Sequence, residues 1–144
     1  MARMMAKVKT PRLNRNATPA PCDASVYCRD LDRWAHSWMG LEKDLPPGEA
    51  LVICFRPFIE HLASSSLSPR TIRRHVDNLW LLGGEIIRDL HYDPSLRKKT
   101  AETLLRKAVH EDGGPLVHNG SEEEQGSFDA TRRKIHRFLT QSQR

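Results

Sequence analysis

Apolar residues recur along this chain with the three- and four-residue spacing that is typical of amphipathic helices. In the segment from residue 23 onward, one apolar stripe is formed by Tyr27, Leu31, Trp34 and Trp38. Asp23 precedes the stripe and is a candidate N-cap. This pattern predicts a first helix that begins near Asp23 and ends at Gly40.

The second apolar segment follows a loop that contains Pro46, Pro47 and Gly48, so we expect no helix before about residue 48. Its stripe consists of Leu51, Phe55, Phe58 and Leu62. Pro57 lies inside this pattern and removes one backbone hydrogen bond. The segment is therefore predicted to kink near residues 53–54 or to form two short helices, ending at the serines 64–66.

A third helix is predicted to begin at Ser68, a good N-cap residue, with Pro69 at the first helical position. Its apolar stripe consists of Ile72, Val76, Leu79, Gly83, Ile86, Ile87 and Leu90. Gly83 lies on this stripe and Gly84 follows it. Two interpretations are open: either Gly83 permits a close helix crossing, or the helix breaks there and restarts at Glu85.

The remaining pattern predicts two more helices. One is expected to begin at Asp93 and Pro94 and to end at Gly113, and the other to begin with a capping box formed by Ser121 and Glu124. We find no repeat and no convincing strand. The sequence thus predicts an all-α, single-domain bundle of about five helices. Its expected parts are a flexible basic arm (1–22), a helical core (23–112), a loop (113–120) and a C-terminal helix (121–144).

The net charge of +5 is located in the N-terminal arm. The five basic residues of positions 1–20 are Arg3, Lys7, Lys9, Arg12 and Arg15, and no acidic residue accompanies them. The other 18 basic residues equal the 18 acidic ones, so the folded body is neutral and any basic patch on it must arise from uneven distribution. The arm has the charge of a mitochondrial targeting peptide, but its three prolines favour a disordered tail.

The sequence offers little support for an enzyme. Cys22, Cys28 and Cys54 form no CxxC pair, and no zinc-ligand spacing or phosphate-binding or nucleophile motif is present. The acidic run 122–124 is expected to be a helix start rather than a cation site. No apolar run is long enough for a membrane span. We therefore predict a cytoplasmic protein with free thiols, without catalytic activity, metal or cofactor.

The first candidate site is the start of the third helix, where Arg70, Arg73 and Arg74 lie away from the apolar stripe. Cations near the free backbone N–H groups of a helix start can bind an anion such as a DNA phosphate. The alternative is that Asp77 pairs with Arg73 or Arg74 at a spacing of four or three residues and leaves only Arg70 in solvent.

A second candidate consists of the basic arm together with Lys98 and Lys99, which could track phosphates or enter a minor groove. The alternative is a tail and a solvated helix face. The third candidate is the apolar run Trp80, Leu81 and Leu82, either as part of a central core helix or as an interface for a partner or for self-association.

The segment 58–86, and more loosely residues 24–110, resembles the core-binding domain at the N-terminus of phage-integrase-type tyrosine recombinases. The residues that carry the resemblance are Phe58, Leu62, Leu67, Ser68, Thr71, Ile72, His75, Leu79 and Leu82. In that family the domain is helical and grips DNA, so the resemblance implies phosphate contacts by Arg70, Arg73 and Arg74.

The resemblance does not extend to catalysis. That family's catalytic domain would need a much longer chain, and neither Tyr27 nor Tyr92 lies in the context of its nucleophile. We therefore expect a stand-alone, non-catalytic module that binds double-stranded DNA or assists recombination, of bacterial and mobile-element type. The alternative is a helical protein-interaction module, namely an adaptor, an antitoxin-like partner or a homodimer, that uses Trp80, Leu81 and Leu82.

Overall fold

The computed structural model describes residues 26–110 and 121–142. Their α-helices are α1 (Trp34–Trp38), α2 (Leu45–Ala63), α3 (Pro69–Tyr92), α4 (Ala101–Ala108) and α5 (Glu122–Ser142). Three short 3₁₀ helices connect them: η2 (Leu31–Arg33), η3 (Glu42–Asp44) and η4 (Pro94–Lys98). No strand occurs in these two ranges, and the predicted all-α, single-domain bundle is confirmed.

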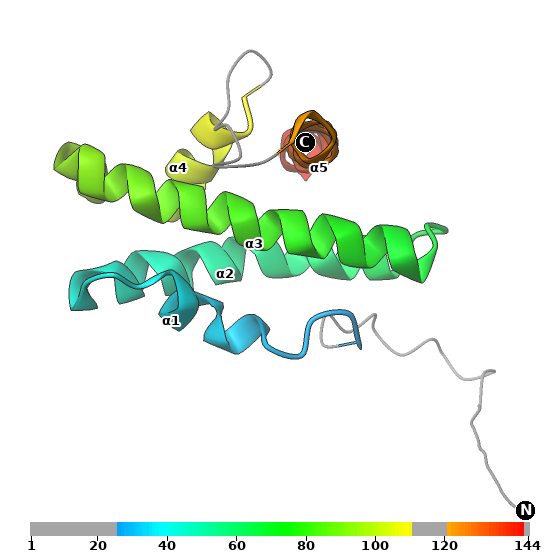
Figure 1. Ribbon diagram of the computed structural model, residues 1–144, viewed down its shortest axis with the longest axis horizontal. Helices are drawn as coiled ribbons and strands as arrows, with labels where there is room; N and C mark the ends of the chain where they lie inside the picture. The colour runs from blue at the N-terminus through cyan, green and yellow to red at the C-terminus, as the bar shows by residue number, and fades with distance from the viewer. Residues whose placement is uncertain (1–25, 111–120, 143–144) are drawn as a thin grey trace, which may run out of the picture.

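Helices α2 and α3 form an antiparallel pair around which the other helices pack (Figure 1). α1 lies on one side of the pair, while α4 and α5 lie on the other. Figure 1 shows α5 almost end-on, so this helix crosses α3 steeply instead of running beside it. Side chains from all these layers meet in one core, whose fully buried members include Phe55, Phe58, Leu79, Leu105 and Phe128.

The predicted helix ends agree with the structure where side-chain caps were identified. Ser68 caps α3, since its hydroxyl accepts a hydrogen bond from the backbone N–H of Thr71 at 3.2 Å. The capping box of α5 is also present: Ser121 Oγ accepts from the Glu124 N–H at 3.1 Å, and Glu124 Oε1 accepts from the Ser121 N–H at 2.8 Å. Each cap satisfies a backbone donor that the helix itself leaves unpaired.

The first predicted helix was too long. Its apolar residues Leu31 and Trp34 are buried, but in the described part they belong to η2 and the five-residue α1. The candidate cap Asp23 lies outside the described residues. α1 ends because the backbone at Met39 becomes extended, and the N–H groups of Gly40 and Leu41 then donate to Asp44.

In the second segment, the structure differs from the prediction at its prolines. α2 begins at Leu45, with Pro46 and Pro47 in its first turn, where an N–H has no partner within the helix. α2 also continues through Pro57 as a single helix, so the predicted pair of short helices is wrong. Packing explains the continuity: Pro57 is exposed, whereas its neighbours Phe58 and Ile59 are completely buried.

The helix predicted from Asp93 onward is divided in two. Asp93 caps only η4, and Thr100 caps α4 through a hydrogen bond from the Thr103 N–H to its hydroxyl at 3.1 Å. By contrast, α3 does not break at Gly83 and Gly84. The close-crossing interpretation is correct, because the ring of Trp38 lies directly against Gly83.

Candidate nucleic-acid interface

The start of α3 presents three arginines to solvent. Arg70, Arg73 and Arg74 are all exposed in the first two turns that follow the Ser68 cap. Within the described residues, none of them forms an ion pair with a carboxylate. The alternative pairing with Asp77 is therefore not formed. Consistently, burial and then the nearby Asp30 raise the pKa of Asp77.

Arg73 differs from the other two arginines because its guanidinium lies over an aromatic ring. Its Cζ is 5.7 Å from the ring centroid of Tyr27, a cation–π contact that keeps the charge of the arginine. This contact holds Arg73 against the segment that precedes η2. Arg70 and Arg74 form no ion pair with a carboxylate in the described ranges, so their charges remain available to an external anion.

A buried hydrogen-bonded junction attaches α5 to α3 beside these arginines. His75 Nδ1 and Thr131 Oγ1 are 2.7 Å apart. The side-chain amide of Asn78 donates to Thr131 Oγ1 at 2.9 Å and to Ser127 Oγ at 3.1 Å. Since His75, Asn78 and Thr131 are all buried, the junction fixes which part of α5 lies next to Arg74.

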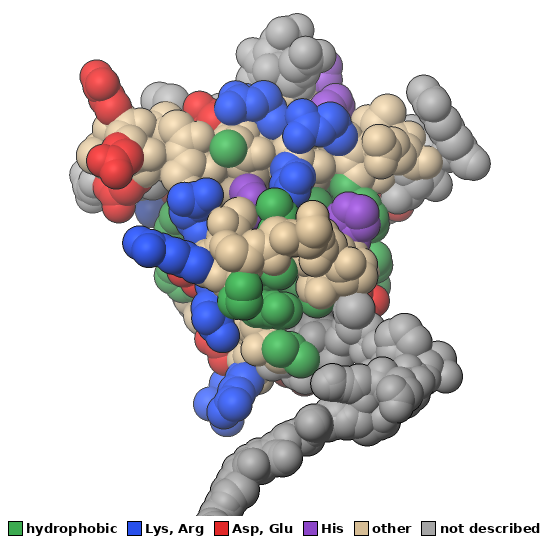
Figure 2. All heavy atoms as spheres, turned by 90° about the vertical axis from the view of Figure 1, so that its right-hand side faces the viewer, with side chains coloured by type: hydrophobic (Ala, Val, Ile, Leu, Met, Phe, Trp, Pro, Cys, Tyr) green, Lys and Arg blue, Asp and Glu red, His purple; other side chains and the backbone are tan. Residues whose placement is uncertain are grey.

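Lys134 of α5 reaches the same region as Arg74 of α3. Burial lowers the pKa of His75, and the positive charges of Lys134 and then Arg74 lower it further. Both cations therefore act on one imidazole from two different helices. Figure 2, which views the end of the molecule where α3 begins, shows Lys and Arg side chains gathered across this surface, with acidic side chains toward its edges.

We call this surface the basic face and define it by its cationic side chains from both helices. They are Arg70, Arg73 and Arg74 of α3 and Arg133, Lys134 and Arg137 of α5. The α5 members were missed as site residues, because basic residues after the first turn of a helix are explained by the helix dipole. The sequence indicates that these three residues lie away from the stripe of Phe128 and Ile135, but it does not indicate that Lys134 acts on His75 of α3.

Arg132, in contrast, is a structural residue. It is buried and donates hydrogen bonds to the carbonyl oxygens of Val109 and His110, just beyond the last turn of α4. A cation at this position satisfies free carbonyl groups and complements the negative end of the helix dipole. Arg132 therefore connects α5 to α4 and does not belong to the basic face.

The structure does not bring Lys98 and Lys99 to the basic face. Both are exposed, but they follow the C-terminal end of α3, whereas the arginines lie at its start. A helix of 24 residues is about 36 Å long at 1.5 Å per residue. Other members of the predicted site, Arg3, Lys7, Lys9, Arg12 and Arg15, lie outside the described residues.

The residue before these lysines, Arg97, helps to hold the fold together. Its guanidinium donates to the completely buried carboxylate of Asp44 at 2.7 Å, and His91 Nε2 lies 2.8 Å from the same carboxylate. Burial alone would raise the pKa of Asp44. The hydrogen bonds from Arg97, from the N–H groups of Leu41 and Gly40 and from His91 outweigh it and hold that pKa well below its usual range.

The apolar run at residues 80–82 is divided between surface and core. Leu82 is only 1% exposed, so its predicted role at an interface is wrong: it faces the core stripe of α3. Trp80 remains 40% exposed, although its Nε1 donates to Ser37 Oγ at 2.8 Å. Leu81 is half-buried.

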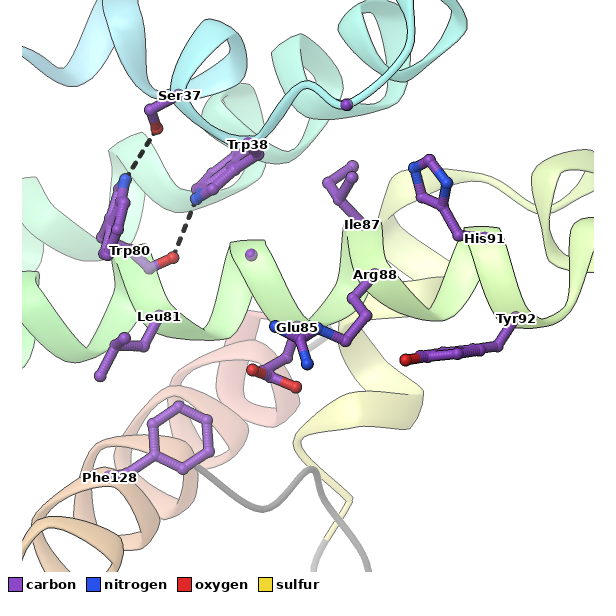
Figure 3. Close-up of a pocket in the computed structure, with 12 residues that line it drawn as sticks. Ser37, Trp38, Trp80, Leu81, Glu85, Ile87, Arg88, His91, Tyr92 and Phe128 are labelled. Atoms are coloured by element: carbon purple, nitrogen blue, oxygen red, sulfur yellow. Dashed lines mark hydrogen bonds between the residues drawn. The ribbon is translucent and has the colours of Figure 1, made fainter. Parts of the chain in front are cut away.

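Trp80 and Leu81 line a groove of about 570 Å³ between α1, the second half of α3 and the start of α5. Figure 3 shows Trp38 and Trp80 on the α1 side of this groove and Phe128 on the α5 side. The indole N–H of Trp38 donates to the carbonyl oxygen of Trp80 at 3.0 Å and so fixes that wall. Tyr92, exposed, marks the other end of the groove.

Neither metal-binding nor nucleophilic groups converge in the described residues. No group of three or more His, Cys, Asp or Glu side chains there could hold a metal ion. Cys28 and Cys54 are free thiols, and burial raises the pKa of Cys28 to about 12, which disfavours the reactive thiolate. Among the described helices, none is both long and apolar enough to cross a bilayer.

Comparison of the chain with protein-family models, with curated proteins and with solved structures found no significant match.

Proposed function

We propose that this protein is a non-catalytic module that binds the phosphate backbone of double-stranded DNA with the start of α3. The observation that carries the proposal is the exposure of Arg70, Arg73 and Arg74 with no ion pair to a described carboxylate. Guanidinium groups donate bidentate hydrogen bonds to phosphate oxygens and keep their charge at any physiological pH.

Charge distribution supports the same proposal. Beyond residue 20 the chain has equal numbers of basic and acidic residues. If basic side chains are concentrated on the basic face, the rest of this part of the chain must therefore have an excess of acidic side chains. Such an uneven distribution creates a local positive potential on a neutral body. The resemblance of residues 58–86 to recombinase core-binding domains points in the same direction and stays a prediction.

The test is a titration of a fluorescent mixed-sequence DNA duplex, followed by anisotropy over a series of salt concentrations. Each phosphate contact contributes about −0.9 to the slope of log K against log salt. The double variant R70A/R74A should therefore reduce the magnitude of the slope by about 1.8. K98A/K99A removes the same charge at the opposite end of α3 and is the matched control.

Two results would contradict the proposal. One is the absence of duplex binding by the wild-type protein at low salt. The other is an R70A/R74A variant whose affinity and slope equal those of K98A/K99A, because binding would then depend on total charge or on another part of the chain.

A second candidate function is protein–protein interaction through the groove at Trp80 and Leu81. The observation that favours it is the 40% exposure of a tryptophan on the wall of a groove, since exposed aromatic side chains are enriched at interfaces. A second copy of the chain is the simplest occupant to test. Light scattering after size-exclusion chromatography should show a dimer for wild type and a monomer for L81E, whereas two monomers would argue against self-association.

A further inference from the structure

We propose that α5 supplies the second half of the DNA-binding surface, so that a duplex lies across the junction of α3 and α5 and places a phosphate between Arg74 and Lys134. This inference rests on the proposed function and extends it to a helix that sequence reasoning did not connect with the site.

The first argument is that the junction holds the two cations in a fixed relation. His75 is 7% exposed and Thr131 is 1% exposed, and their side chains meet at 2.7 Å. Arg74 immediately precedes His75, and Lys134 follows Thr131 by three residues, which places it on the adjoining turn of α5. The buried hydrogen bonds fix the register of the two helices, so the backbone positions from which Arg74 and Lys134 extend are fixed relative to each other.

The second argument is electrostatic. Burial lowers the pKa of His75, and the positive charges of Lys134 and then Arg74 lower it further, as expected for two cations that flank the buried junction. No described carboxylate forms an ion pair with either cation. An anion between them would replace a repulsion with two attractions and would add charge-assisted hydrogen bonds.

The third argument concerns the extent of the surface along α5. Arg133 and Arg137 are exposed at a spacing of four residues, and Lys134 and Arg137 are three apart, so like charges are neighbours on the helix surface. The acidic residues Glu122, Glu123 and Glu124 occupy the opposite end of the same helix. Polyanion contact is therefore expected along the C-terminal half of α5, beginning at Lys134, which acts on His75 together with Arg74.

The fourth argument selects duplex DNA over a single strand. Proteins that bind single strands stack bases on accessible aromatic rings. Of the aromatic residues near the basic face, Tyr27 is half-buried beneath Arg73, and Phe138 is half-buried against Phe58 and His61. The exposed rings of Trp80 and Tyr92 line the groove instead. Within the described residues, a face with cations and without an exposed Phe, Tyr or Trp ring suits the outside of a duplex.

The experiment compares three double variants of the full chain that remove the same number of charges: R70A/R74A, K134A/R137A and K98A/K99A. Binding to one duplex is measured by anisotropy over a salt series, together with binding to a single strand of the same length. We expect K134A/R137A to reduce the magnitude of the salt slope by about 1.8, as R70A/R74A does. K98A/K99A should change it little, and the single strand should bind more weakly than the duplex.

The outcomes separate the two proposals. If R70A/R74A weakens binding and K134A/R137A behaves like K98A/K99A, the inference about α5 is wrong and the proposed function stands. If neither weakens binding, both are wrong, and equal or tighter binding of the single strand overturns the choice of a duplex. Because the stem of Lys134 is half-buried, K134Q/R137Q keeps most of the side-chain length and removes the charge. Its slope must match that of K134A/R137A if charge, rather than packing, is responsible.

Discussion

Gly83→Ala offers a direct test of how the helices cross. A methyl group at this position would lie 2.2 Å from Cζ2 and 2.4 Å from Cη2 of Trp38, which is far inside van der Waals contact. The indole cannot easily retreat, because its N–H donates to the Trp80 carbonyl at 3.0 Å and its ring packs against Trp34 and Phe55. The substitution must therefore displace a constrained aromatic ring.

The magnitude follows from two opposing effects. Replacing glycine by alanine in a helix interior stabilises by about 1 kcal/mol. Overpacking a constrained site costs about 1–3 kcal/mol, and displacing a packed aromatic ring costs more. We expect Gly83→Ala to lower the free energy of unfolding by about 2 kcal/mol, because the cost of displacing the Trp38 ring exceeds the gain in helix propensity.

Gly126→Ala is the matched control, since a methyl group there would meet no atom within 4 Å. Gly126→Ala should raise the free energy of unfolding by about 1 kcal/mol through helix propensity alone. Both variants are measured by urea denaturation with linear extrapolation. In a double-mutant cycle, Trp38→Leu should destabilise the Gly83→Ala background less than the wild type. A Gly83→Ala protein as stable as Gly126→Ala would refute the reasoning.

Two further predictions concern buried titratable groups. Asp44→Asn leaves Arg97 without its charged partner and should lower the free energy of unfolding by about 3 kcal/mol in urea at pH 7. Because hydrogen bonds hold the folded pKa of Asp44 below its ordinary value of 3.8, wild-type stability should fall as the pH drops below that value, and Asp44→Asn should show a weaker acid dependence. An equally steep acid loss in the variant would contradict this role. Burial, and then the charges of Lys134 and Arg74, hold the pKa of His75 in the folded protein below its ordinary value of 6.5. As the pH falls, the imidazole is therefore protonated in the unfolded chain before it is protonated in the folded protein. The free energy of unfolding should decrease as the pH falls through 6.5. Lys134→Ala should raise that pKa in an NMR titration of the imidazole, and an unchanged value would show that Lys134 does not act on His75.

Local chemistry made several features of the fold predictable. The caps Ser68 and Ser121 are found where the sequence placed them, because a side-chain acceptor at a helix start acts within one turn of its own position. The stripes of α2 and α3 are likewise buried as expected, since helical periodicity alone selects the face that turns inward. These interactions extend over three or four residues, so they can be predicted without knowing which helix packs against them.

Predictions failed where packing overrides a local preference. Pro57 does not interrupt α2, and the residues just before Trp34 form the 3₁₀ helix η2 with a buried Leu31 instead of extending α1 toward the N-terminus. Each of these outcomes depends on the net balance between a local cost and contacts made elsewhere. That balance cannot be obtained from the spacing of residues.

The candidate site divides in the same way. The exposure of Arg70, Arg73 and Arg74 followed from their place on the polar side of a well-defined helix, so the sequence by itself determined it. Only the tertiary structure decided that Lys134 and Arg74 both act on His75, that Lys98 lies at the far end of α3, and that Asp77 forms no ion pair with Arg73 or Arg74. The physical reason is the sequence distance over which each effect acts. Helix periodicity acts over a few neighbouring residues and fixes which face of the helix a side chain occupies. The charged neighbours of that side chain depend on where helices that are distant in sequence cross.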